Sequence, residues 1–195
     1  MIKKLVFASN NTHKLSEIIS LAENRFSILS LADIGCFDEI AETSMTLEGN
    51  AFLKAHHVFS KYGMDCFADD TGLEIDALNG RPGVFSARYA GEGCSFNDNI
   101  VKLLDEMKEV KCRTARFRTT ICLIINGIEH YFEGRVEGEI LSECQGKEGF
   151  GYDPVFRPTG YEESFAEMPL FLKNQISHRG RAVEKLMKFL IESAV

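Results

Sequence analysis

The sequence predicts an α/β fold in which helices flank a mixed β-sheet. Short apolar stretches typical of buried strands alternate along the chain with longer stretches of helical periodicity. In the second half the strands follow one another more directly, as in a meander, which favours a mixed sheet over a purely parallel one. No internal repeat and no Pro- and Ser-rich linker interrupts the pattern, so we expect one domain over residues 1–195.

The first half is predicted to run strand, helix, strand, helix. The strands are expected at 4–9 (KLVFAS) and 26–31 (FSILSL), and the helices within 10–24 and 46–63. Gly63 would end the second helix, because glycine readily adopts the left-handed conformation that follows a helix. The residues predicted to face the core are Leu15, Ile18, Ile19 and Ala22 in the first helix and Leu47, Ala51, Val58, Phe59 and Tyr62 in the second.

The second half is predicted to begin with two short strands in 65–78 (DCFADDTGLEIDAL), separated by a turn at Thr71 and Gly72. After them the pattern predicts a helix, two strands of a hairpin and a final helix, at 95–107, 114–126, 127–141 and 178–193. The final helix is expected to bury Ala182, Val183, Leu186, Leu190 and Ile191.

Composition limits the possible partners. The net charge of −7 argues against a general nucleic-acid-binding surface. No apolar stretch approaches the roughly 20 residues that span a bilayer, and the apolar run at the N-terminus is too short for a signal peptide. The six cysteines form no CxxC pair, so the usual zinc and redox motifs are absent, and their scattered spacing is typical of reduced thiols. We therefore expect a cytoplasmic protein that binds neither a nucleic-acid polymer nor a membrane.

The stretch SNNTHK (9–14) lies between a predicted strand and a predicted helix. Free N–H groups at a helix N-terminus favour an anion such as phosphate, and Lys14 adds a full positive charge. The glycines of a Walker P-loop are missing, so the stretch also fits a capped turn with a solvated lysine. In either case Asn11 or Thr12 could cap the helix.

Two adjacent acids, Asp69 and Asp70, end an apolar strand in FADDTG (67–72). An aspartate at a strand end can hold Mg²⁺ or orient a water molecule, and Glu42 could supply a second oxygen ligand. Successive strand residues point to opposite faces, so at most one aspartate faces a given site unless the turn intervenes. An Asx-turn and a solvated Glu42 are the alternative interpretations.

The stretch GFGYDPVF (149–156) combines the rings of Phe150 and Tyr152 with two glycines that allow a ligand to approach the backbone. Asp153 can accept a hydrogen bond from an N–H donor. The same stretch also fits a bulged strand that ends at Pro154.

The stretch KNQISHRGRA (173–182) places Lys173, His178 and Arg179 near the start of the last helix, where basic side chains oppose the helix dipole. A local conflict of this kind is typical of functional sites, although an ordinary basic helix start is the alternative. Together the four stretches contain a phosphate cradle, a metal carboxylate, an aromatic platform and donors that could read a base. These are the parts of a nucleoside triphosphate site.

The chain resembles the inosine triphosphate pyrophosphatases, the Ham1-like pyrophosphatases of non-canonical purine nucleotides. Five blocks in the family's order carry the resemblance over nearly the whole chain: FASNNTHKLSEI, TLEGNAFLKA, FADDTGLEIDALNGRPGVFSARYAG, GFGYDPVF and KNQISHRGRA. The resemblance implies an elongated α/β fold of two lobes with the active-site cleft between them. It also implies a homodimer that uses Mg²⁺ to hydrolyse ITP, dITP and XTP to the monophosphate and pyrophosphate, and so removes deaminated purines from the nucleotide pool.

The resemblance implies roles for the matching residues. Asp70 would be the catalytic acid/base, and Glu42 and Asp70 would bind the metal. The implied substrate-binding residues are Ser9, Asn10, Asn11, Thr12, His13, Lys14, Thr71, Phe150, Gly151, Tyr152, Asp153, Lys173, His178 and Arg179.

Among these residues, Lys173, His178 and Arg179 would donate to the acceptor at C6 of hypoxanthine or xanthine. Asp153 would accept from the base edge or fix Lys173. Two departures from the family pattern affect the backbone. Asn11 is expected to take a positive φ where the family often has glycine, and Pro169 is expected to shift the start of the following helix.

Other functions stay open at this point. A different house-cleaning pyrophosphatase, acting on pyrimidine or methylated nucleotides, would share the phosphate chemistry and differ in its base contacts. A nucleotide-binding regulator without turnover would be expected to lack Asp69, Asp70 and Glu42, all of which are present. An RNA-binding module is disfavoured, because the chain has no basic stripe and no RNP-like aromatic strand.

Overall fold

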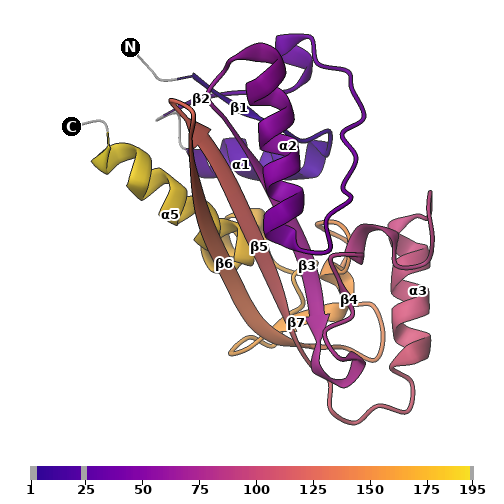
Figure 1. Ribbon diagram of the computed structural model, residues 1–195. Helices are drawn as coiled ribbons and strands as arrows, with labels where there is room; N and C mark the ends of the chain where they lie inside the picture. Colours follow the sequence, from indigo (N-terminus) through magenta and orange to yellow (C-terminus); the bar gives the residue numbers. More distant parts are fainter. Residues whose placement is uncertain (1–3, 23–25, 194–195) are drawn as a thin grey trace. The chain divides into compact units, whose positions relative to one another are not determined.

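The computed structural model describes residues 4–22 and 26–193, which form two compact units. Unit 1 comprises the described residues of Met1–Asp70, Thr119–Gly134 and Arg179–Val195, and unit 2 comprises Thr71–Arg118 and Arg135–His178. Over the described residues the strand order is β2-β1-β3-β5-β6-β7, and β4 pairs with β3 (Figure 1). The strands are β1 Lys4–Phe7, β2 Ser27–Leu29, β3 Cys66–Ile75, β4 Pro82–Gly83, β5 Thr114–Ile125, β6 Ile128–Ile140 and β7 Phe156–Pro158.

Five α-helices and several 3-10 helices lie within the described ranges. The α-helices are α1 Thr12–Ala22, α2 Leu47–Tyr62, α3 Phe96–Glu106, α4 Leu170–Ile176 and α5 His178–Glu192. The 3-10 helices are η1 Ala32–Ile34, η2 Asp76–Leu78, η3 Ser86–Arg88 and η4 Asp153–Val155. None of the helices in this part of the chain is long and apolar enough to cross a membrane.

The sheet contains both parallel and antiparallel pairs. Strand β1 is parallel to β2 and to β3, whereas β4 is antiparallel to β3 and β7 is antiparallel to β6. Asn126 and Gly127 connect β5 to β6 with φ values of 52° and 76°, the signature of a tight two-residue hairpin. The predicted α/β class with a mixed sheet is therefore confirmed, and the cleft expected between two lobes stays a prediction.

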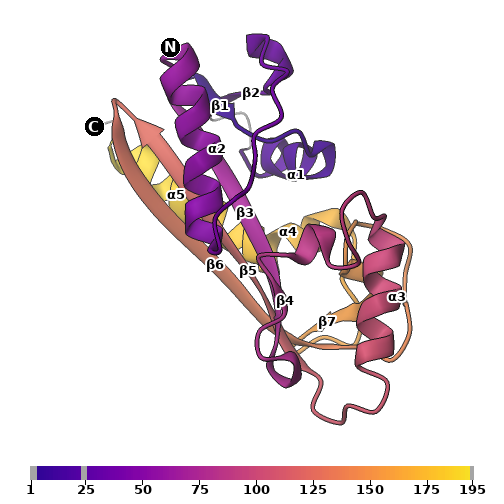
Figure 2. The same cartoon turned by 45° about the vertical axis from the view of Figure 1, so that its right-hand side comes forward.

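Unit 1 has three layers, with its part of the sheet between helices on either face (Figure 2). Side chains alternate between the two faces of a strand, so Phe7 and Phe67 pack with α1 and α5, whereas Ala8 and Ala68 pack with α2. Fully buried apolar residues on both faces explain the nearly continuous hydrophobic runs of β1 and β3. This alternation also determines where polar residues further along β3 can point.

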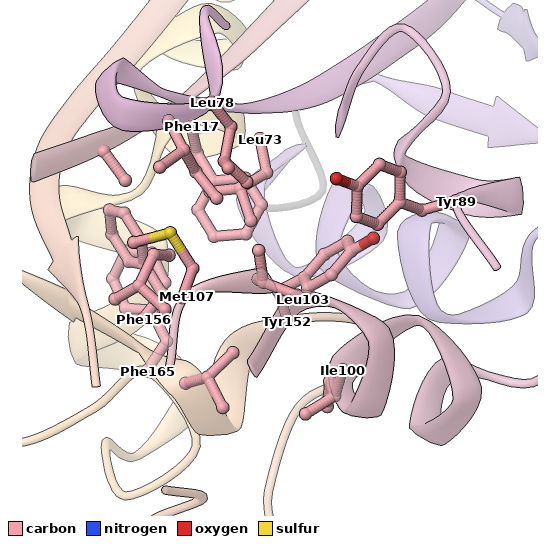
Figure 3. Packing of buried hydrophobic residues seen from close by; sticks show 14 of the residues in the cluster. Leu73, Leu78, Tyr89, Ile100, Leu103, Met107, Phe117, Tyr152, Phe156 and Phe165 are labelled. Carbon is pink, nitrogen blue, oxygen red and sulfur yellow. The ribbon is translucent and has the colours of Figure 1, made fainter. Parts of the chain in front are cut away.

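Unit 2 has a separate core in which aromatic and aliphatic side chains gather between α3 and the strands (Figure 3). Phe117 lies at its centre, 4.7 Å from the ring of Phe156 in an edge-to-face contact and 6.3 Å from the ring of Phe165. Leu103 and Met107 of the α3 region are fully buried against this cluster. The side chain of Ser95 and that of Asp98 form a capping box that fixes the start of α3.

Most of the predicted elements are confirmed, including β1, β2, α1, α2, α3, the β5–β6 hairpin and α5. Gly63 ends α2 with φ 63°, as expected. Pro169 directly precedes α4, and the expected shift of this helix start relative to the family stays a prediction. Two inward assignments are wrong, because the side chains of Ile19 and Ile191 are 53% and 44% exposed. In α1, Glu17 is buried and Ile19 is exposed. In α5, Leu190 is the last buried residue of the apolar stripe, and Ile191 lies about 100° further around the helix.

The turn predicted at Thr71 and Gly72 is also wrong, because β3 continues without interruption from Cys66 to Ile75. Gly72 has no side chain, and this allows β4 to lie close to β3. A Cβ atom on Gly72 would lie 2.8 Å from the carbonyl oxygen of Gly83, on the strand that pairs with β3. The continuous strand holds Asp69 and Asp70 in regular β conformation.

We expect Gly72→Ala to lower the free energy of unfolding by about 1–3 kcal/mol, because the added methyl group meets backbone that cannot move freely. Urea denaturation followed by circular dichroism measures this change. Gly35→Ala is the control: it introduces a methyl group at φ 70° in open space, so it probes conformational strain alone, at about 1 kcal/mol. A Gly72→Ala variant that is no less stable than Gly35→Ala contradicts the close-approach explanation.

Candidate active site

Asp69 and Asp70 are consecutive residues of β3 and have separate sets of partners. Asp69 bonds Lys14 of α1 and Arg179 of α5, whereas Asp70 bonds Asn50 and Lys54 of α2. The two carboxylates therefore point to opposite faces of the sheet in unit 1, as strand geometry requires. The adjacent acids are not an Asx-turn but two separate polar centres.

A buried chain of alternating charges surrounds Asp69. Lys14 Nζ lies 3.0 Å from Asp69 Oδ1, Arg179 Nε lies 3.0 Å from Asp69 Oδ2, and Arg179 Nη1 lies 2.5 Å from Glu17 Oε2. Asp69 and Arg179 are almost completely buried, so each charge depends on the next for compensation. The chain Lys14–Asp69–Arg179–Glu17 sums to zero formal charge.

The partners of Asp69 keep it ionised. Burial alone would raise the pKa of Asp69, but the positive charges of Lys14, Arg179 and Lys54 hold this pKa well below its usual range. Burial also lowers the pKa of Lys14, against the opposing effect of Asp69. Asp69 is thus a fixed anion at neutral pH and is poorly suited to exchange protons.

Asp70 has a different electrostatic environment. Its Oδ2 accepts from Asn50 Nδ2 at 3.2 Å and its Oδ1 lies 3.3 Å from Lys54 Nζ, which also lies 2.5 Å from Glu42 Oε1. Burial raises the pKa of Asp70 above its ordinary value despite the positive charges of Lys54 and Lys14. Asp70, Glu42 and the opposing carboxylate Asp69 together outweigh burial and raise the pKa of Lys54. Two neighbouring acids with pKa values shifted in opposite directions are an arrangement suited to acid/base chemistry.

The stretch 9–14 forms the connection between β1 and the N-terminus of α1. Asn11 caps this helix: its Oδ1 accepts from Lys14 N at 3.0 Å, and its carbonyl accepts from Leu15 N at 3.0 Å. The expected positive φ at Asn11 is wrong, because among the described non-glycine residues only Asn79 and Asn126 have positive φ. A capping residue takes extended backbone, so no left-handed residue is needed here.

A second polar group lies in unit 2, around the loop that begins at Gly149. Lys173 Nζ lies 2.8 Å from Asp153 Oδ2, and the same oxygen accepts from Phe150 N at 2.7 Å. The Lys173 ammonium also lies 5.0 Å from the centre of the Phe150 ring. A Cβ atom on Gly149 would collide with Asp153 Oδ2, so this glycine lets the loop fold onto the carboxylate.

The stretch 149–156 therefore begins as a tight loop with positive φ at Gly149 and Gly151, continues as η4 and ends at the first residue of β7, so it is not a bulged strand. Tyr152 lies in the core of unit 2 and donates to Ser86 O at 3.0 Å, so its ring packs with the protein interior. His178 is buried and stacks on Phe117, with ring centroids 4.6 Å apart. The ring that lies nearer the surface is Phe150, which is half-buried and 6.0 Å from Phe96.

Comparison with known proteins gives the family. The model of the Ham1 family matches residues 5–189, nearly the whole chain. The chain belongs to the Ham1 family.

Relatives of this Ham1 protein match it over almost their full length. A protein of Flavobacterium psychrophilum named dITP/XTP pyrophosphatase is 55% identical over 186 residues, which cover 95% of this chain and 98% of the relative. Another of the same name, from Flavobacterium johnsoniae, is 54% identical over 187 residues and covers 96% and 97% of the two chains. The structure of a HAM1 protein from Coxiella burnetii superposes with a TM-score of 0.90 at 38% identity, covering 98% of this chain and 100% of that one.

The structure of this Ham1 protein divides the predicted site residues into three groups. Lys14 and Arg179 lie with Asp69, Glu42 lies with Asp70, and Phe150 lies with Asp153 and Lys173. The guanidinium of Arg179 pairs with Asp69 and Glu17 in unit 1, and its expected contact with the base stays a prediction. Ser9, Asn10 and Asn11 lie in the β1–α1 connection, Thr12 and His13 begin α1, and Thr71 follows Asp70 on β3.

Three polar residues of these groups were missed by the sequence analysis: Glu17, Asn50 and Lys54. Asn50 and Lys54 lie three and seven residues after Leu47, on the buried face of α2. The sequence signal that could have identified them is their position within the apolar stripe of the helix. A buried amide or ammonium group there needs a specific polar partner. Glu17 gave a weaker signal, because it neighbours the buried Ile18 on α1 without following the apolar period.

We expect Arg179→Met to lower the free energy of unfolding by about 3–5 kcal/mol, because it leaves Asp69 and Glu17 buried without their shared cation. Chemical denaturation at neutral pH measures the change. Arg135→Met is the matched control: the Arg135 side chain is 54% exposed beside Glu137, so the cost should stay within about 1 kcal/mol. Equal losses of unfolding free energy for the two substitutions would show that the buried ion pairs of Arg179 do not contribute the expected stability.

Proposed function

We propose that this chain is a nucleoside triphosphate pyrophosphatase that hydrolyses dITP, ITP and XTP to the monophosphate and pyrophosphate, and so removes deaminated purines from the nucleotide pool. The observation that carries the proposal is the pair of carboxylates on β3, one fixed as an anion by Lys14 and Arg179 and the other with a raised pKa beside Glu42 and Lys54. The names of the full-length relatives, dITP/XTP pyrophosphatase, support the reaction and the substrate class.

The triphosphate is proposed to bind at the β1–α1 connection. The N-terminus of α1, which begins at Thr12, presents the positive end of the helix dipole, and this end favours phosphate oxygens. Lys14 uses one N–H donor for Asp69, and its side chain remains 13% exposed, so its other donors can reach an anion. Asp69 would hold the lysine in place for this contact.

Asp70 is proposed to accept the proton of the water that attacks the α phosphorus. Asp69 is committed to ion pairs with Lys14 and Arg179, which makes Asp70 the better placed of the two acids to accept a proton. Asn50 fixes the orientation of the Asp70 carboxylate through Oδ2, and Lys54 approaches the other oxygen. The bond to the β phosphate breaks as the α phosphate gains the hydroxyl group, and pyrophosphate leaves as one piece.

The residues around Lys54 fit the proposed Mg²⁺ cofactor. Glu42 Oε1 and Asp70 Oδ1 both contact one ammonium, so these two carboxylates converge closely enough to hold a single cation, and carboxylate oxygens are the ligands that Mg²⁺ prefers. When bound there, Mg²⁺ would offset the negative charge of the phosphate oxygens. Glu42 and Asp70 are the proposed ligands.

Base recognition is proposed to depend on Phe150 and Lys173. The Phe150 ring can stack on a purine without selecting among purines. Lys173, held by Asp153, can only donate, so it favours the C6 oxygen of hypoxanthine and xanthine over the C6 amine of adenine. Roles for His178 and Arg179 at the base belong to the same proposal. Phe117 stacks on His178, and Asp69 and Glu17 pair with Arg179.

A homodimer and a cytoplasmic location also belong to the proposal. The scattered cysteine spacing, which is typical of reduced thiols, supports the location. The family resemblance supports the dimer, and sedimentation equilibrium of the purified chain measures it directly.

The deciding experiment is a panel of nucleoside triphosphates assayed separately for pyrophosphate and orthophosphate, with and without Mg²⁺. We expect pyrophosphate as the product and kcat/KM values for dITP, ITP and XTP about 10⁴-fold above that for ATP, because an amine at C6 leaves a buried donor unpaired. GTP shares the C6 oxygen and should be rejected less strongly than ATP.

Release of orthophosphate without pyrophosphate would exclude cleavage between the α and β phosphates. Preference for pyrimidine or methylated nucleotides would instead support a house-cleaning pyrophosphatase of different specificity. Tight binding of ITP without turnover would support a nucleotide-binding regulator.

A further inference from the structure

Three side chains with metal-binding atoms meet in unit 1, outside the groups described above. Cys36 and Asp38 lie in the loop after η1, and His57 lies on α2. Cys36 Sγ, a carboxylate oxygen of Asp38 and a ring nitrogen of His57 all lie within 4.8 Å of one another. We propose that Cys36, Asp38 and His57 form a binding site for a thiophilic divalent cation of the Zn²⁺ class.

The spacing of these atoms is close to that of a tetrahedral site. Bonds of about 2.3 Å to sulfur and about 2.0 Å to nitrogen or oxygen place tetrahedral ligand atoms about 3.3–3.5 Å apart. Asp38 Oδ2 lies 2.7 Å from His57 Nε2 and 4.0 Å from Cys36 Sγ, on either side of that spacing. The Asp38 side chain is 36% exposed, so it has room to rotate away from His57 and toward Cys36, which moves both separations toward that range.

The donor set selects the class of metal. Thiolate and imidazole are ligands for Zn²⁺ and similar transition metals, whereas Mg²⁺ prefers oxygen ligands throughout. The site is thus chemically distinct from the carboxylate pair Glu42 and Asp70. Three protein ligands leave the fourth tetrahedral position for water, which the partly exposed Asp38 and His57 can admit.

A positively charged group already lies beside Asp38. Lys61 Nζ lies 2.6 Å from Asp38 Oδ2, which shows that this position already holds a cation. Lys61 is 50% exposed and can swing into solvent when a metal takes its place. Cys36 itself is buried, so the sulfur is held in position.

Occupancy would connect two parts of unit 1. The metal would join the loop that carries Cys36 and Asp38 to the middle of α2, which begins at Leu47. The same loop continues to Glu42, which contacts Lys54 one helical turn before His57 on α2. We therefore expect the bound metal to stabilise the folded chain through binding to the native state alone.

The test is Zn²⁺ titration of the purified full chain after chelator treatment, by calorimetry in excess Mg²⁺, which occupies sites built from oxygen ligands. We expect one Zn²⁺ per chain and a rise in melting temperature. Cys36→Ser and His57→Gln should each weaken binding at least about 10-fold and abolish the rise in melting temperature. Co²⁺ in place of Zn²⁺ should give a thiolate-to-metal absorption band that Cys36→Ser removes.

Two controls separate this site from adventitious binding. His56→Gln changes the exposed histidine next to His57, and Cys112→Ser removes an exposed thiol, so both should bind Zn²⁺ like the unmodified chain. If the buried Cys36→Ser variant fails to fold, His57→Gln and Asp38→Asn still test whether these side chains bind Zn²⁺, because both residues are partly exposed. No binding by the unmodified chain, or binding that the ligand variants leave unchanged, would overturn the proposal.

Discussion

The structure depends on one electrostatic constraint: the adjacent carboxylates Asp69 and Asp70 of the buried strand β3 each need positively charged partners of their own. Because β3 is extended at Asp69 and Asp70, one side chain faces α1 and α5 and the other faces α2. The hydrogen bonds described above give the two acids no partner in common, and neither acid is exposed enough to rely on water. Each helical layer of unit 1 must therefore supply its own cations, Lys14 and Arg179 on one side and Lys54 on the other.

The two solutions differ, and this difference gives the site its chemistry. Asp69 lies in a charge-balanced series of ion pairs with Lys14, Arg179 and Glu17, and this series keeps the carboxylate ionised. Around Asp70, a single cation is shared with Glu42, and burial raises the pKa. A fixed anion that orients Lys14, the lysine proposed to bind phosphate, thus lies next to a carboxylate whose pKa is raised. Unit 2 contains a similar buried ion pair, in which the charges of Lys173 and Asp153 compensate each other next to the Phe150 ring.

Much of this could be predicted from sequence, because helix and strand periods and the order of motifs are local properties. The strand that leads to Asp69 and the helix that contains Lys14 were both located in this way, whereas the bulged strand considered around Phe150 is a loop. The failures concern tertiary partners. A glycine after Asp70 suggested a turn, and only the close approach of Gly83 shows that the strand continues. The partners of Arg179 could not be predicted either, because Glu17 and Asp69 lie 162 and 110 residues away in sequence.

The central claim, that Asp69 serves structure and Asp70 serves chemistry, is tested most directly by measuring kcat and unfolding free energy together for Asp69→Asn and Asp70→Asn. Asp70→Asn should lower kcat for ITP by about 10²–10⁴ and leave the unfolding free energy unchanged or higher, since a proton acceptor is lost and a buried charge is removed. Asp69→Asn should lower the unfolding free energy by about 3–5 kcal/mol, because Lys14 and Arg179 lose their common anion. A stable Asp69→Asn variant together with near-native turnover by Asp70→Asn would contradict the account.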